Sequence, residues 1–234
     1  MKIAIMQPTF APWIGQFEMM DYVDKFIFLD IVQYVKREWQ NRNRFKIENR
    51  EYMFSIPIKK PSRDLILKDA VIFEDFRDKL INMLNQYYKK ASYFKEVHSF
   101  LKDTISYKTD YLSEYNIHFI ERTAKKLGIK AEFITLSKTN FKTNKKKGGL
   151  ILEICKYFGA KTYVSPFGAM GYMKEVESEF KNNGIDVIYQ SYNHPVYNQL
   201  GDNFISHLSI IDFLYNEGFN IEIIRKGRNY IKEM

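Results

Sequence analysis

The strongest candidate for acid–base chemistry is His194, in the segment QSYNHPVYNQ. An imidazole titrates near neutral pH without help from its surroundings, so His194 could take a proton from an attacking amine or pass one on. Tyr192, Tyr197 and Gln199 flank it and could orient the ring or a substrate. The alternative interpretation is a turn at the proline that follows, with a structural histidine held by hydrogen bonds.

A second polar segment, DIVQYVKREWQNRNR, covers residues 30–44 and mixes an acid, amides, a phenol and several cations. Arg37, Arg42 and Arg44 could hold a diphosphate, because a guanidinium can pair with two phosphate oxygens at once. Asp30 could orient a catalytic histidine. A solvated basic loop is the alternative, although long polar loops in compact domains are commonly functional. The remaining candidates for contacts to a sugar or base are Gln33, Tyr34, Asn41 and Asn43.

The segment QPTFAPWIG, residues 7–15, is short and stiff because its two prolines fix backbone torsions. Phe10 and Trp13 supply flat apolar faces that could stack on a base or a sugar. Gln7 offers both a donor and an acceptor. We therefore expect a pocket wall here, and a structural plug over the end of a sheet is the alternative. The segment contains neither GxGxxG nor GxxxxGK[ST], the glycine-rich patterns that bind nucleotide phosphates.

Other candidate residues carry weaker signals. Ser165, in SPFGAMGY, could face the same ligand, but the pattern lacks a nucleophile elbow and predicts no catalytic serine. His98, His118 and His207 fall on helical patterns and are expected to be surface or capping residues. No pair of histidines or cysteines shows the spacing of a metal site, so we expect no metal and no required cofactor.

These segments can act together only if the fold brings them close to one another. Residues 2–6 and 25–29 are short apolar runs that predict buried strands, and residues 15–22 between them predict a helix. This succession has the size of a βαβ unit, which favours a parallel sheet. Further strands are predicted at residues 132–136, 162–164 and 186–190. The predicted fold is therefore α/β and Rossmann-like, with a mostly parallel sheet.

Two additions complete the predicted architecture. Residues 44–48 and 51–58 predict a β-hairpin turning at Asn49-Arg50, and residues 75–127 predict a helical layer or insertion. Residues 71–73 are a further candidate strand, and helices are predicted at 149–158, 175–183 and 208–216, the last capped by Ser206.

The whole chain, residues 1–234, is predicted to form one domain, since no linker or internal repeat interrupts it. In an open α/β sheet, ligands bind beyond the carboxyl ends of the strands. Polar residues follow three predicted strands, at 7–8, 30–43 and 192–199. We therefore expect these segments to meet in one crevice.

The chain is basic, with 36 Lys and Arg against 28 Asp and Glu. A basic surface attracts phosphates, although residues 138–147 alone hold five lysines and predict a solvated loop. The single cysteine, Cys155, lies on an apolar helical face and predicts a buried thiol in a reducing compartment. No apolar run is long enough to span a bilayer and no signal peptide is evident. A cytoplasmic location without membrane insertion is therefore expected.

Taken in order, four segments resemble the WbqC-like family of bacterial proteins over nearly the whole chain. They are MQPTFAPWIGQF, DIVQYVKREWQNRNR, residues 163–172 and YNHPVYNQLGDNFISHLSIIDFLYNEG. The family usually has a second acid where this chain has Ile31, which weakens a paired-carboxylate mechanism. It commonly has Ser-Gly where this chain has Ser165-Pro166, which alters one pocket wall.

The resemblance implies a role in surface-polysaccharide and O-antigen biosynthesis. It suggests a transferase that adds an acyl or aminoacyl group to a nucleotide-linked amino sugar, with acyl-CoA or aminoacyl-tRNA as co-substrate. Two alternatives remain. One is a non-catalytic nucleotide-sugar-binding or scaffold protein. The other is an RNA- or tRNA-binding protein that uses the lysine run and the aromatic residues.

Overall fold

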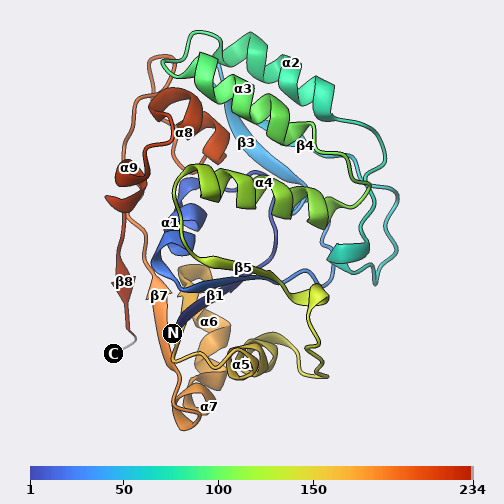
Figure 1. Ribbon diagram of the computed structural model, residues 1–234, viewed down its shortest axis with the longest axis vertical. Coiled ribbons are helices and arrows are strands. Elements are labelled where there is room, and N and C mark those ends of the chain that lie inside the picture. Colours follow the sequence, from blue (N-terminus) through green and yellow to red (C-terminus); the bar gives the residue numbers. More distant parts are fainter. Residues whose placement is uncertain (233–234) are drawn as a thin grey trace.

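The computed structural model describes residues 1–232 and is an α/β protein built on a six-stranded sheet (Figure 1). The strands lie in the order β5-β2-β1-β6-β7-β8, and all pair in parallel except β8, which is antiparallel to β7. Their bounds are β1 Lys2–Met6, β2 Lys25–Phe28, β5 Glu132–Thr135, β6 Thr162–Pro166, β7 Asp186–Gln190 and β8 Tyr230–Ile231. The predicted fold class is confirmed, and the first five strands have a doubly wound order.

Alternating side chains of the strands enter two separate cores. Phe26 and Phe28 of β2 point to one face of the sheet, whereas Ile27 points to the other. Helices α1, α4 and α8 cover the first face, and α5, α6 and α7 cover the second (Figure 1). Cys155 of α5 is buried in the second core, as predicted. The helix bounds are α1 Ile14–Tyr22, α4 Leu112–Lys126, α5 Lys147–Tyr157, α6 Met170–Met173, α7 Glu177–Asn182 and α8 Ile210–Glu217.

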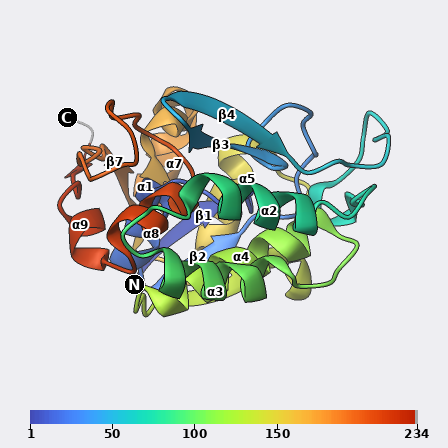
Figure 2. The ribbon, with the colours of Figure 1, turned by 90° about the horizontal axis from the view of Figure 1, so that it is seen from above.

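A β-hairpin and two further helices lie over the first face. β3 Arg42–Ile47 pairs with β4 Arg50–Ser55, and α2 Arg77–Tyr88 and α3 Phe94–Ile105 lie near α4 (Figure 2). The predicted helical stretch is thus confirmed as three helices. The predicted turn is wrong by one residue, because Ile47 pairs with Arg50 and Glu48-Asn49 makes the turn. Glu48 takes a φ of 54°. Two-residue hairpin turns favour asparagine or glycine at such positions, so the sequence pattern pointed to Asn49 and not to Glu48 as the first turn residue.

Several short elements differ from the predictions. Within the predicted strand at residues 71–73, Val71 and Ile72 form only isolated bridges. Ser209, not Ser206, caps α8, since its Oγ accepts the backbone N–H of Ile211. The sequence interpretation also missed α9 Ile221–Arg225 and strand β8, which are too short for a periodic signal. Four 3₁₀ turns, Leu67–Asp69, Leu136–Lys138, Phe167–Ala169 and Lys174–Val176, complete the described elements.

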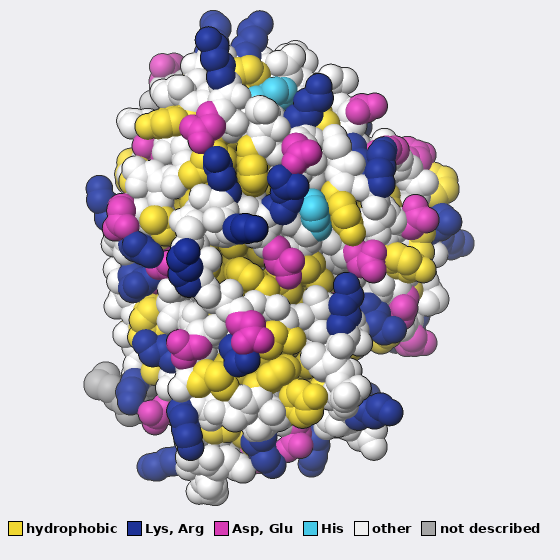
Figure 3. Space-filling model, viewed as in Figure 1, with side chains coloured by type: hydrophobic (Ala, Val, Ile, Leu, Met, Phe, Trp, Pro, Cys, Tyr) yellow, Lys and Arg dark blue, Asp and Glu magenta, His cyan; other side chains and the backbone are white. Residues whose placement is uncertain are grey.

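The net positive charge is spread rather than gathered on the face seen in Figure 3, where lysines and arginines alternate with acids. Within residues 1–232, no helix is long and apolar enough to cross a membrane.

Candidate functional site

The strand order locates the position where a ligand of a doubly wound sheet binds. From β1 the chain proceeds to β2 on one side, and β6 later pairs on the other side of β1. The carboxyl ends of β1 and β6 therefore flank the point where the order reverses, which is the usual ligand crevice of such sheets. Trp13, the residue before α1, lies in the connection that leaves β1.

The connection between β1 and α1 is held by side chains from distant segments. Asn43 Nδ2 donates to the carbonyl oxygens of Phe10 (2.9 Å) and Ala11 (2.8 Å), and Ser209 Oγ also donates to that of Ala11 (2.8 Å). Ala11 takes a φ of 40°, which costs free energy in an alanine and persists because these bonds fix its carbonyl. The stiff loop is therefore positioned by β3 and by the cap of α8.

Trp13 is the centre of an aromatic cluster from three parts of the chain. Its ring stacks on His207 with centroids 4.9 Å apart, lies 6.0 Å from His194, and meets the edge of Tyr192 at 5.3 Å. Gly15 packs so close that a Cβ there would lie 2.3 Å from Trp13 Cη2. The tryptophan is thus a fixed wall, and its ring already stacks on protein.

A hollow of about 270 Å³ opens beside Trp13, and we call it the Trp13 pocket. Trp39, which is 41% exposed, lines it together with Arg44, whose guanidinium carbon lies 5.4 Å from the Trp39 ring. Arg44 Nη1 donates to Glu51 Oε1 and Nη2 to the His207 carbonyl, each at 3.0 Å. The full lining is Met6, Thr9, Pro12, Trp13, Gln16, Trp39, Asn43, Arg44 and His207. Residues of two predicted segments, 7–15 and 30–44, therefore meet here, and His207 joins them from the stretch before α8.

Two buried donors that line the Trp13 pocket have no hydrogen-bond partner among the described residues. They are Gln16 Nε2 and Arg44 Nε. Gln16 is only 3% exposed, and its Oε1 accepts the hydroxyl of Thr9 at 3.0 Å. Buried donors are normally paired, so these two are exceptions, and neither atom is exposed to the hollow.

Trp13 also lines a second hollow of about 270 Å³, at the ends of β6 and β7. Phe167, which is 52% exposed, and Tyr192 form its apolar walls, and Gln190 lines it. Gln190 Nε2 donates to the Gly15 carbonyl at 2.7 Å, which ties β7 to α1. One tryptophan thus borders two hollows at the carboxyl edge of the sheet.

His194 lies in the cluster, and both its ring nitrogens are engaged by the backbone. Nδ1 lies 2.9 Å from the Pro195 carbonyl, and Nε2 accepts the N–H of His207 at 3.1 Å. These bonds assign the proton to Nδ1. Burial, followed by the nearby His207, lowers the pKa of His194 to about 4. The ring is neutral at pH 7 and has no free lone pair for a substrate.

His207 is the other imidazole of the cluster, and the sequence did not indicate it as a catalytic candidate. It is exposed, with a φ of 58°, and precedes α8 rather than lying on a helix. Nδ1 lies 2.9 Å from Ser206 Oγ, and the structure gives Nε2 no partner within residues 1–232. Burial, followed by the charge of Arg44, lowers the pKa of His207. Its Nε2 is open to a ligand, and it is basic in the tautomer in which Nδ1 carries the proton and donates to Ser206 Oγ.

Tyr197 and Asp30, two of the residues expected to orient His194, form hydrogen bonds with other residues instead. Tyr197 donates its hydroxyl to Asp212 Oδ2 at 2.8 Å, and its ring only packs 6.1 Å from that of His194. Asp30 is buried, accepts the backbone N–H of Ser137 at 3.0 Å, and also accepts the hydroxyl of that serine. The structure thus joins Asp30 to the segment after β5, and the strands β2 and β1 lie between β5 and β6.

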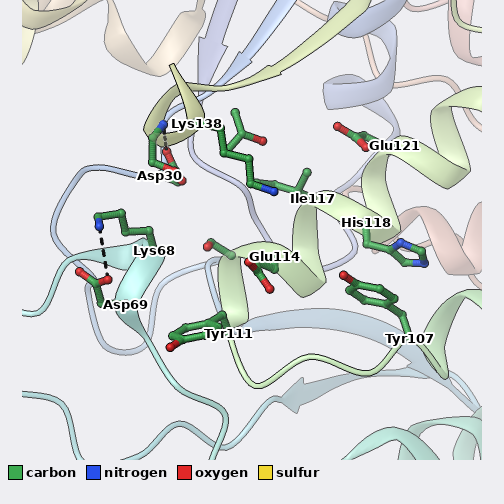
Figure 4. Close-up of a pocket in the computed structure, with 13 residues that line it drawn as sticks. Asp30, Lys68, Asp69, Tyr107, Tyr111, Glu114, Ile117, His118, Glu121 and Lys138 are labelled. Atoms are coloured by element: carbon green, nitrogen blue, oxygen red, sulfur yellow. Dashed lines mark hydrogen bonds and ion pairs between the residues drawn. The ribbon is translucent and has the colours of Figure 1, made fainter. Parts of the chain in front are cut away.

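Asp30 lines a different hollow, of about 360 Å³, shown in Figure 4. Its walls mix charges: Lys68 pairs with Asp69 at 3.4 Å, and Glu114 accepts the hydroxyl of Thr109 at 2.7 Å. His118 stacks on Tyr107 with centroids 3.8 Å apart. The lining residues are Asp30, Lys68, Asp69, Tyr107, Tyr111, Ser113, Glu114, Ile117, His118, Glu121, Thr135, Ser137 and Lys138.

Other residues predicted to bind a substrate are buried or form hydrogen bonds within the protein, and they do not line the Trp13 pocket. Phe10 and Ser165 are fully buried, and Phe10 packs 6.1 Å from Phe54. Gln7 accepts Gln40 Nε2 at 2.6 Å. The remaining contacts are Asn41 Nδ2 to the Ile56 carbonyl, Gln33 Nε2 to the Arg63 carbonyl, and Gln199 Nε2 to Asp212 and the Ile205 carbonyl. Tyr34 is 7% exposed and lines a separate hollow with Gln33.

The predicted crevice is therefore partly assembled. The structure brings Trp13, Asn43, Arg44, Tyr192 and His194 together. Arg42 lies close by, 5.9 Å from the Trp39 ring, whereas Arg37 is exposed with a φ of 63°. Sequence reasoning missed the pocket residues Thr9, Gln16, Trp39 and His207. Trp39 could have been found from its place among the arginines.

Among residues 1–232, no group of three His, Cys, Asp or Glu side chains could hold a metal ion.

Comparison of the sequence with known proteins identifies a family to which the chain is similar. The model of the WbqC-like protein family matches residues 7–222, which include every residue of the Trp13 pocket except Met6. An uncharacterized protein of Mycobacterium tuberculosis is 28% identical over 221 residues, covering 93% of this chain and 94% of that protein. No solved structure shows a significant match.

Proposed function

The chain belongs to the WbqC-like protein family, and we propose that it transfers an acyl or aminoacyl group to the amine of a nucleotide-linked sugar during surface-polysaccharide biosynthesis. One observation carries this proposal. Segments distant in the sequence converge on Trp13, where they surround a partly apolar hollow with an arginine, an exposed tryptophan and an available imidazole. A small number of placed polar groups in an apolar pocket is typical of a small-molecule site.

The arginines would bind the diphosphate from the rim of the pocket. Arg42 suits this role, because its guanidinium carbon lies 5.9 Å from the ring of the exposed Trp39. Arg44 is already bonded to Glu51 and to the His207 carbonyl, so it would contribute charge more than new bonds through its Nη atoms. Trp39 would offer the stacking surface, since the ring of Trp13 is already covered by His207. The cytoplasmic location and the co-substrates stay part of this proposal.

His207 would act as the base, with His194 as a positioning residue. The amine nitrogen attacks the acyl carbon, and the bond from that carbon to the thiol of acyl-CoA, or to the ribose hydroxyl oxygen of aminoacyl-tRNA, breaks. His207 Nε2 takes the proton that the amine loses and returns it to the leaving sulfur or oxygen. His194 would hold the His207 backbone through its 3.1 Å bond.

Mass spectrometry of the reaction tests the proposal. The purified protein is incubated with UDP- and dTDP-linked amino sugars, each with a panel of acyl-CoAs or aminoacyl-tRNAs. We expect one donor and acceptor pair to give a product heavier by the acyl group. The variant His207→Ala should lower turnover by at least about a hundredfold, since acid–base groups contribute typically 10²–10⁴-fold. No product from any pair would overturn the proposal.

The arrangement of His194 favours one second candidate, a non-catalytic nucleotide-sugar-binding or scaffold protein. The residue first expected to be the base has both ring nitrogens bound to the backbone. Thermal shift at two salt concentrations separates these functions. Stabilisation by a sugar nucleotide without turnover supports the binding protein, whereas stabilisation by tRNA that falls steeply with salt supports RNA binding.

A further inference from the structure

The second hollow beside Trp13, at the ends of β6 and β7, has no part in the proposed transfer, and we call it the Phe167 hollow. It has a volume of about 270 Å³, and its lining includes Phe167, Gln190, Ser191 and Tyr192. None of the described residues in this lining is ionised at neutral pH, since burial raises the pKa of the Tyr192 phenol. A charged group would find no counter-charge there, so the hollow suits an uncharged part of a ligand.

Gln190 presents one accessible acceptor to the Phe167 hollow. Its Nε2 donates to the Gly15 carbonyl at 2.7 Å and to Glu18 Oε2 at 2.6 Å, so both amide protons are used. Its Oε1 has no partner among residues 1–232, and it is not one of the fully enclosed atoms of this kind, so it keeps exposed surface. Gln190 is only 6% exposed and lines the hollow, and Oε1 is therefore the polar atom that it offers there.

The carboxylate of Glu18 fixes the direction of this acceptor. Glu18 is fully buried and also accepts Nε of Arg228 at 2.6 Å and the hydroxyl of Tyr230 at 2.8 Å. Turning the Gln190 amide over would bring its oxygen against two acceptors, the Glu18 carboxylate and the Gly15 carbonyl, and would lose both hydrogen bonds. Oε1 is thus held as an acceptor, and the ligand atom that meets it must carry a hydrogen.

Aromatic rings form much of the wall of the Phe167 hollow. The ring of Phe167 is 52% exposed, so it is free to pack on a ligand. Tyr192 is held in place, because its hydroxyl donates to the Ile224 carbonyl at 2.9 Å and a Cβ on Gly227 would lie 2.5 Å from its ring. Nucleic-acid bases stack on accessible aromatic side chains. A flat heterocycle with an N–H group satisfies both the walls and the acceptor.

We propose that the Phe167 hollow binds the uracil or thymine base of the nucleotide-linked sugar. The base would stack on Phe167, and its N3–H would donate to Gln190 Oε1. The Ser191 hydroxyl would donate to one of the two carbonyls beside N3. A single ring also suits the volume of about 270 Å³, which lies just below the range of about 300–1,000 Å³ for drug-sized ligands.

This inference rests on the proposed function and divides its ligand between two hollows. Trp13 lines both of them, so a ligand with its base in the Phe167 hollow can extend past the indole towards Arg44. The diphosphate would then lie at the arginines, and the amino sugar would lie in the Trp13 pocket, which His207 lines. Trp39 would stack on the sugar rather than on the base.

Isothermal titration calorimetry of the full-length protein tests the base. UDP, dTDP, their N3-methyl derivatives and ADP carry the same diphosphate, so differences between them report contacts of the base. We expect UDP or dTDP to bind at least about tenfold more tightly than its N3-methyl derivative and than ADP, as expected for one lost hydrogen bond in a buried site. Equal affinities, no binding of UDP or dTDP, or a preference for ADP would each overturn the base site.

Phe167→Ala supplies the matched comparison in the protein. It removes the stacking ring and should weaken the preferred nucleotide at least about fivefold, the lower limit for stacking of one base on an aromatic ring. The variant should fold, because about half of this ring is exposed. Phe73→Ala removes another exposed phenylalanine that does not line the hollow, and should leave binding unaltered. Undiminished binding by Phe167→Ala, or an equal loss in both variants, would contradict the inference.

The two proposals fail in different ways. Binding of UDP or dTDP that needs N3–H and Phe167, without transfer from any donor, keeps the base site and rejects the transferase. Transfer that Phe167→Ala leaves unchanged in both kcat and KM keeps the transferase and rejects the base site.

Discussion

The backbone N–H of His207 donates to Nε2 of His194 at 3.1 Å, and both rings pack on Trp13. This bond requires a neutral His194, because a protonated ring nitrogen cannot accept it. It also holds His207 in its left-handed conformation at the pocket rim. The state of one histidine thus sets the position of the other.

The bond makes stability depend on pH. The pKa of His194 falls from 6.5 to about 4 on folding, so stability is fully present above pH 6.5 and is lost as the pH falls towards 4. At pH 5 the loss is on the order of 1 kcal/mol, because solvent screens this partly exposed ring. Urea unfolding at pH 7 and pH 5 measures it. His194→Gln should show a flatter dependence than the native protein, and identical profiles would refute the coupling.

Gly15→Ala should disturb the Trp13 wall. A methyl group would lie 2.3 Å from the indole, so the ring must shift, at a cost of about 1–3 kcal/mol. Tryptophan fluorescence and thermal unfolding report the change. Gly149→Ala is the matched control on α5, where the added carbon meets Lys145 at an ordinary 3.6 Å. Equal effects of the two substitutions would show that Gly15 is not needed for the tryptophan.

Asp212→Ala should be among the most destabilising changes near the site. The carboxylate is fully buried and accepts the hydroxyls of Tyr88 (2.9 Å) and Tyr197 (2.8 Å) and Nε2 of Gln199 (3.0 Å). Its loss leaves buried donors unpaired, which costs about 3 kcal/mol in total by denaturant unfolding. Asp103→Ala removes an exposed partner of Arg122 and should cost under about 1 kcal/mol. Similar losses for the two variants would contradict this assignment.

Asn43→Asp tests the support of the loop between β1 and α1. The amide donates to two carbonyls, whereas a carboxylate would repel both Phe10 O and Ala11 O. We expect a loss of about 2–4 kcal/mol, measured by thermal unfolding, and weaker ligand binding. Asn85→Asp on the exposed side of α2 is the control. Unchanged melting of Asn43→Asp would mean that the loop keeps its conformation without this contact.

The patterns of apolar residues along the sequence were sufficient to predict many of the strands and helices. The apolar runs of β1 and β2, the helical spacing through α2 to α4 and the strand at 186–190 are properties of neighbouring residues, and all are present. Short elements without a period were predicted poorly. The sequence predicts Ser206 as the cap of α8, whereas Ser209 caps it, because two serines lie close to the same apolar run and the local pattern does not separate them.

The sequence by itself thus determined the α/β class, the family resemblance and the polar segments at strand ends. Only the tertiary structure decided which side chains are available for chemistry. Asp30 bonds to Ser137 and Tyr197 to Asp212, whereas His207 and Gln16 come to border the Trp13 pocket. The reason is physical. Backbone preference is decided by adjacent residues, but burial and hydrogen-bond partners are supplied by segments far away in the chain.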